Sequence, residues 1–167
     1  MKNILIPTDL SQKSLDVVHE VVKKNKNQQV NLYLVHMVRT PTDALELLFL
    51  KRNDLYSEVP REFFQSINDL RSTYPNQLGQ IRFEFYYGHR AGILHSIIEN
   101  LEIDEICVPD NHNFLLPLEQ SVNMLPLLES CPVPVFKAPV YGKVSLQGNG
   151  IMSSILAGHR SHSVVAQ

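Results

Sequence analysis

The histidines and cysteines could do chemistry, but their spacing forms no site that we recognise. The chain has seven His and two Cys. His159 and His162 are three residues apart and could share one face of a helix. No carboxylate or cysteine accompanies them in that part of the chain, so we expect no metal site. Cys107 and Cys131 form no CxxC pair, and we expect buried apolar residues rather than nucleophiles.

The short motifs of familiar enzyme classes are missing. The sequence contains no GxxxxGKS/T, no GxGxxG after a strand, no GxSxG and no HExxH. It places no nucleophile beside a base. We therefore predict no catalytic residue, and a function that is not enzymatic.

Two polar loops remain as candidates for a ligand-binding site, and each follows a short apolar run. Residues 7–11 (Pro-Thr-Asp-Leu-Ser) follow the first run, and residues 109–113 (Pro-Asp-Asn-His-Asn) follow the run at 105–108. Asp9 and His112 are the side chains there that could hold a polar ligand. The alternatives are a helix cap or turn for Asp9, worth about 1 kcal/mol, and a solvated loop residue for His112.

The elements that would position these loops alternate along the chain. Apolar runs predict strands, and apolar stripes with helical spacing predict the segments between them. This alternation of strands and helices predicts an α/β fold with a five-stranded parallel sheet and helices on both faces. The apolar-polar alternation at 81–87 and Pro134 mark strands 3 and 5 as edges, which selects a doubly wound sheet with strand order 3-2-1-4-5. Strands 1 and 4 would then meet at the switch point, which brings the two loops together. The predicted strands are 3–7, 30–38, 81–87, 105–108 and 133–136, and the predicted helices are 11–25, 42–49, 60–74, 88–101 and 115–129.

Composition limits the class of protein and of partner. The chain has 167 residues, 44% of them hydrophobic, and a formal net charge of −2. We expect no nucleic-acid partner and no membrane span, and a cytoplasmic location. Residues 1–138 read as one domain. Residues 139–167 read as a C-terminal extension, with a strand near 140–146 and a short helix near 151–156, or partly disordered.

Several segments together resemble the universal stress protein family, over about residues 1–138. Residues 4–11 (ILIPTDLS) resemble its opening, and 35–37 (VHM) resemble the end of its second strand. Residues 88–91 (GHRA) and 103–106 (IDEI) resemble its passage into strand 4, and 130–133 (SCPV) its entry to strand 5. The resemblance implies an adenine nucleotide alpha hydrolase-like fold and a stress-response protein.

The resemblance also implies where a nucleotide would bind, and this sequence departs from the pattern there. ATP-binding members carry G-x2-G-x9-G-S/T, in which glycines let backbone amides approach the phosphates. Pro109, His112 and Gln120 stand near the three glycine positions, and the segment is about two residues shorter. We therefore expect no cofactor, with an ATP or AMP switch, or a slow ATPase, as the alternative. The implied binding residues are Pro7, Thr8, Asp9, Met37, Pro109, His112 and Ser121.

Two of the remaining expectations concern Ser121 and assembly. Ser121 would cap the helix that starts near it, or else touch phosphate. The resemblance implies a homodimer that pairs fifth strands, with the C-terminal extension in the interface. Pro134 would remove one donor from strand 133–136, either toward strand 4 or toward the open edge. We also expect a protein partner, and no motif in the sequence identifies it.

Overall fold

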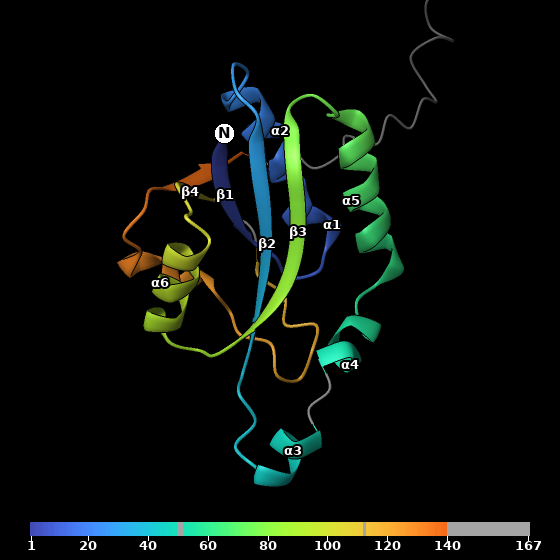
Figure 1. The fold of residues 1–167 in the computed structure, drawn as a ribbon, viewed down its shortest axis with the longest axis vertical. Coiled ribbons are helices and arrows are strands. Elements are labelled where there is room, and N and C mark those ends of the chain that lie inside the picture. The colour runs from blue at the N-terminus through green and yellow to red at the C-terminus, as the bar shows by residue number, and fades with distance from the viewer. Residues whose placement is uncertain (50–51, 112, 140–167) are drawn as a thin grey trace, which may run out of the picture.

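The computed structural model of the chain describes residues 1–49, 52–111 and 113–139, and it has the sheet that the alternation predicts. Five parallel strands lie in the order β3-β2-β1-β4-β5. Figure 1 shows this sheet as a strongly twisted layer. The fold class predicted from sequence is therefore confirmed. The strands are β1 (Lys2–Pro7), β2 (Val30–Val38), β3 (Leu78–Tyr87), β4 (Glu105–Pro109) and β5 (Val135–Ala138).

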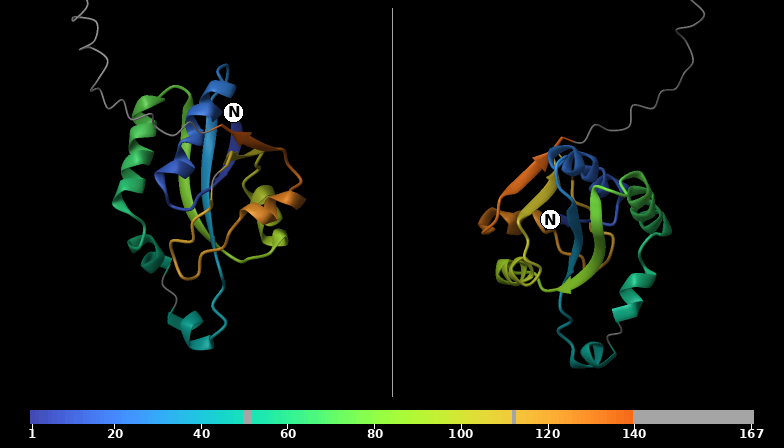
Figure 2. Two further views of the ribbon diagram at one scale, coloured as in Figure 1. Left: turned by 180° about the vertical axis from the view of Figure 1, so that it is seen from behind. Right: turned by 45° about the horizontal axis from the view of Figure 1, so that its top comes forward.

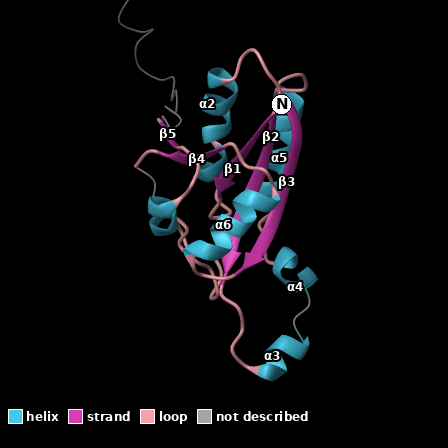
Figure 3. Cartoon of the chain, turned by 60° about the vertical axis from the view of Figure 1, so that its left-hand side comes forward, coloured by secondary structure: helices cyan, strands magenta, loops and turns pink. Residues whose placement is uncertain are grey.

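Helices cover both faces of the sheet. Seen from behind in Figure 2, α1 (Gln12–Leu15), α2 (Val17–Lys24) and α5 (Arg61–Thr73) lie over one face. The other face is covered by α6 (Ala91–Asn100) and a 3-10 helix, η1 (Leu125–Ser130). Two short helices, α3 (Ala44–Phe49) and α4 (Arg52–Ser57), lie beyond the carboxyl ends of β2 and β3 (Figure 3). None of the described helices is long and apolar enough to cross a membrane.

The central strands are apolar on both faces because each face has its own core. In β1, Ile4 and Ile6 pack into the core under α1, α2 and α5, whereas Leu5 packs into the core under α6. All three side chains are at most 1% exposed. This two-sided burial is typical of parallel strands and explains the unbroken apolar runs in the sequence.

The helix predicted at 115–129 is wrong over most of its length. No helix is present from 115 to 124, and η1 begins only at Leu125. Pro117 has no N–H to donate within a helix. The neighbouring backbone pairs with β2 instead: Arg39 N–H donates to the Gln120 carbonyl (2.8 Å), and Val122 N–H donates to the Met37 carbonyl (2.9 Å).

The other boundaries shift less. The helix predicted at 11–25 divides at Asp16 into α1 and α2, and β5 starts two residues later than predicted. Pro134 lies just before β5, and its carbonyl accepts from the Ile106 N–H (2.9 Å). The extension lies outside the described residues from 140 onward, so its predicted strand and helix stay predictions.

A buried carboxylate ties the amino ends of the sheet together. Glu105 accepts from Lys2 (2.5 Å) and from Lys24 and is only 5% exposed. Burial by itself would raise the pKa of Glu105, but the two lysines outweigh it and hold the pKa below its ordinary value. This ion cluster lies at the end of the sheet opposite the loops that carry the candidate site.

Candidate functional site

The carboxyl ends of β1 and β4 lie side by side, because these strands are parallel neighbours in the sheet. The crossovers that follow them run to opposite faces, which makes this place the switch point of the sheet. In such sheets this switch point is where ligands usually bind. Here the loop from Asn113 to Met124 runs across it, between α6 and α4 in Figure 1. The contacts of this loop decide what the switch point can hold.

Asp9 is bound by the chain itself. Its Oδ1 accepts from the backbone N–H of Ser11 (3.1 Å) and from the Ser11 hydroxyl (2.5 Å). Its Oδ2 accepts from the backbone N–H of Leu115 (2.9 Å). The Asp9 side chain is 1% exposed. The first of these contacts is the turn predicted as an alternative role for Asp9, and the last one anchors the loop over the switch point.

His36 links three segments through hydrogen bonds. Its Nδ1 lies 2.7 Å from the carbonyl of Thr8, which can only accept, so Nδ1 carries the proton. Nε2 of the neutral ring therefore accepts from the Ser121 hydroxyl (2.9 Å). The Ser121 oxygen in turn accepts from the Leu118 N–H (3.0 Å). The loop after β1, the end of β2 and the loop after β4 are joined in one buried chain of polar groups.

The environment of His36 favours the neutral ring. Burial lowers the pKa of His36 below its ordinary value, although the hydrogen bond to Thr8 and the charge of Asp9 act in the opposite direction. The ring meets Phe85 edge to face (5.6 Å between centroids) and stacks with Phe114 (6.4 Å, 15° between planes). A neutral, enclosed imidazole holds the loop in place.

Apolar side chains of the same loop complete the cover. Leu118, Val122 and Met124 are buried, Met124 completely, and each packs into one of the two cores. The switch point is thus covered by residues of this chain, with Asp9 and His36 already engaged.

The structure brings together four of the residues predicted as a binding site: Thr8, Asp9, Met37 and Ser121. Ser121 does not cap a helix, which corrects one of the two roles expected for it. Pro7 and Pro109 end their strands, and His112 lies outside the described residues. The link from His36 to Ser121 was missed, because residues 85 positions apart in sequence give no local signal of contact.

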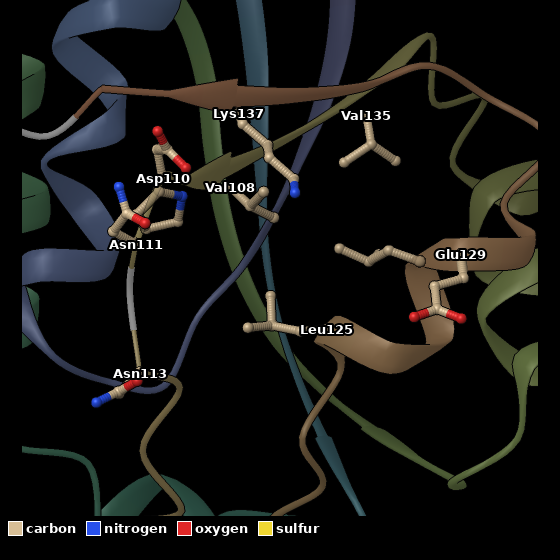
Figure 4. Close-up of a pocket in the computed structure, with 10 residues that line it drawn as sticks. Val108, Asp110, Asn111, Asn113, Leu125, Glu129, Val135 and Lys137 are labelled. Carbon is tan, nitrogen blue, oxygen red and sulfur yellow. The ribbon is translucent and has the colours of Figure 1, made fainter.

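A cavity of about 580 Å³ opens beside the switch point, over the carboxyl ends of β4 and β5 (Figure 4). Its floor is apolar and its rim is polar. It is separate from Asp9 and His36, neither of which lines it. The lining residues are Val108, Pro109, Asp110, Asn111, Asn113, Leu125, Leu128, Glu129, Val135 and Lys137.

Thiol and metal chemistry have little support in the described residues. Burial raises the pKa of Cys107 to about 12 and also raises the pKa of Cys131, so both thiols stay protonated at neutral pH. Within residues 1–49, 52–111 and 113–139, no three His, Cys, Asp or Glu side chains are grouped to hold a metal ion. His159 and His162 lie outside those residues.

Comparison with solved structures finds the same architecture in other proteins. Universal stress protein UspA from Lactobacillus plantarum superposes with a TM-score of 0.52 at 18% identity, covering 82% of this chain and 97% of that one. The chain has the universal stress protein fold.

Two hypothetical proteins share this universal stress protein fold. PH0823 gives a TM-score of 0.55 at 20% identity, covering 85% of this chain and 98% of that one. MJ0577 gives a TM-score of 0.53 at 15% identity, covering 84% and 97%. In sequence, no family model and no curated protein matches the chain. At these identities the likeness is one of fold, and function must be argued from the site.

Proposed function

We propose that this chain is a universal-stress-type protein that binds no ATP, catalyses no reaction and acts through contacts with a protein partner or a small ligand. The observation that carries the proposal is the loop over the switch point. The Asp9 carboxylate already accepts hydrogen bonds from Ser11 and Leu115, and the His36 ring already accepts one from Ser121. A nucleotide would have to displace these contacts before making its own.

The phosphate end of the site supports the same proposal. Pro109 has no N–H to offer, and Gln120 and its neighbours pair with the end of β2. A hydrogen bond to a charged group contributes about 1.5 to 3 kcal/mol, so two missing amide donors would weaken phosphate binding several hundredfold or more.

Mg-ATP is therefore expected to show no micromolar dissociation constant in titration calorimetry, and the gently purified protein should carry no nucleotide in native mass spectrometry. AMP is titrated in parallel, because the alternative function is an ATP or AMP switch. A micromolar constant for either nucleotide that Asp9→Asn abolishes would overturn the proposal and place the nucleotide at the switch point.

We further propose that the protein forms a homodimer through the open edge of β5. The carbonyls of Pro134 and Ala138 accept from the N–H groups of Ile106 and Asp110, so they face β4. Because backbone groups alternate along a strand, those of Val135 and Lys137 point to the open edge. The missing donor of Pro134 thus faces inward, and the outer edge keeps its hydrogen-bonding groups.

Lys137→Pro should weaken the dimer roughly tenfold or more, because two symmetric copies each lose an outward N–H worth about 0.5 to 1.5 kcal/mol. Lys137→Ala, which keeps that N–H, is the matched control. Deleting residues 139–167 is also expected to weaken dimerisation. Sedimentation equilibrium measures all four proteins, and a full-length chain that is monomeric at high micromolar concentration would rule the dimer out.

A further inference from the structure

The cavity over β4 and β5 exists because the crossover between these strands covers the sheet incompletely. The crossover has a six-residue 3-10 helix, η1, where a long helix was predicted, and Pro126 stands in its first turn. Val108 and Val135 form the floor of the cavity and Leu125 lies on a wall (Figure 4). Leu128 of η1 also contributes to the apolar lining. A volume of about 580 Å³ lies within the range of small-molecule sites.

The polar groups of the cavity come from three separate elements. Lys137 projects from β5, and Figure 4 shows its ammonium group pointing inward between Val108 and Val135. Glu129 extends from η1 on another wall, and Asp110 lies at the end of β4. Within the described part of the chain, the side chains of Lys137, Glu129 and Asp110 form no salt bridge or hydrogen bond. Asn111 and Asn113 add amide groups to the rim.

Charge complementarity indicates the chemistry of a ligand. A simple anion would suit Lys137 but meet two carboxylates, and a simple cation would leave Lys137 unpaired. A molecule with both charges and an apolar body satisfies the lysine, a carboxylate and the apolar floor together. We propose that this cavity binds a small zwitterion with an apolar side chain, namely an apolar α-amino acid or a short peptide with free termini.

In this arrangement Lys137 binds the carboxylate of the ligand and Glu129 its ammonium group. The apolar side chain of the ligand lies on Val108 and Val135, against Leu125 and Leu128. The proposal goes beyond the proposed function, because the cavity is separate from Asp9 and His36 and does not require that the switch point exclude ATP.

The test is titration calorimetry or ligand-observed NMR with L-phenylalanine and the dipeptide Phe-Phe. The compound that binds more tightly shows whether the cavity takes a free amino acid or a short peptide. Phenethylamine lacks the carboxylate and 3-phenylpropionate lacks the ammonium group, and each should bind at least tenfold more weakly than phenylalanine. Lys137→Gln and Glu129→Gln should each weaken the binding of the tighter-binding zwitterion by a similar factor.

Exposed residues of the same types supply the matched controls. Lys26→Gln and Glu46→Gln remove the same charges far from the cavity and should leave binding unchanged. Val135→Phe keeps every charge but fills the floor of the cavity, and it should abolish binding in a protein whose circular dichroism is unaltered.

The proposal is overturned if neither zwitterion binds at about 10 mM, if both charge variants bind as the wild type does, or if the singly charged analogues bind equally well. Mg-ATP is added to the same samples. ATP binding that Asp9→Asn removes and Lys137→Gln leaves unchanged would contradict the proposed function alone, so the two failures are distinguishable.

Discussion

Replacing Asp9 with alanine is expected to lower the free energy of unfolding by about 3 kcal/mol, because hydrogen bonds to charged groups contribute about 1.5 to 3 kcal/mol each and their donors would be left buried. The N–H groups of Ser11 and Leu115 and the Ser11 hydroxyl all donate to this carboxylate. Leu115 belongs to the loop over the switch point, so its anchor would be lost as well.

Urea denaturation measures this effect, and Asp16→Ala is the control in the same stretch of chain. Asp16 lies between α1 and α2, and its side chain makes no capping hydrogen bond. Its replacement should change stability by less than about 0.5 kcal/mol. The sequence alone led us to expect about 1 kcal/mol for Asp9. A loss of that smaller size would mean that the carboxylate is kept for a ligand rather than for the fold.

His36→Leu is expected to lower the free energy of unfolding by about 2 to 3 kcal/mol, because the Thr8 carbonyl and the Ser121 hydroxyl both lose their partner in a buried position. Ser121→Ala breaks the same chain of hydrogen bonds and leaves the Leu118 N–H without its acceptor. The double variant should lose less than the sum of the two single losses, since both remove one interaction. Strict additivity would contradict the link.

His36 also predicts a pH dependence. The folded pKa lies below the ordinary value of 6.5, so the unfolded chain binds the proton first as the pH falls. The stability contributed by the neutral ring is therefore complete above pH 6.5 and is lost as the pH falls toward the folded pKa. The difference between wild type and His36→Leu should shrink over that range.

The sheet was predictable because its signals are local. Apolar runs such as 30–38 and the alternation at 81–87 report burial on two faces or on one, and the β-α alternation restricts the topology to a few orders. The start of α1 is also a local feature, because the Ser11 side chain accepts from the Ser14 N–H only three residues away. These patterns arise within a turn or a strand, so the sequence records them directly.

The segment 115–129 shows where local signals fail. Its leucines have helical spacing, yet the backbone of Leu115, Gln120 and Val122 bonds to Asp9 and β2. Two prolines, Pro117 and Pro126, weaken the helix enough for these long-range contacts to prevail. The sequence contains the weakness but does not say which distant groups exploit it.

By itself, the sequence determined the fold class, the strand order and the meeting of two polar loops at the switch point. The fold class follows from periodicity and from the handedness of crossovers, and the order follows from the edge signals at 81–87 and Pro134. Only the tertiary structure decided that Leu115 donates a hydrogen bond to Asp9 and Ser121 donates one to His36. It also decided that a cavity lined by Lys137 and Glu129 opens beside β4. Those contacts join residues far apart in the chain. Their energies depend on burial and on geometry across the sheet, which no window of neighbouring residues contains.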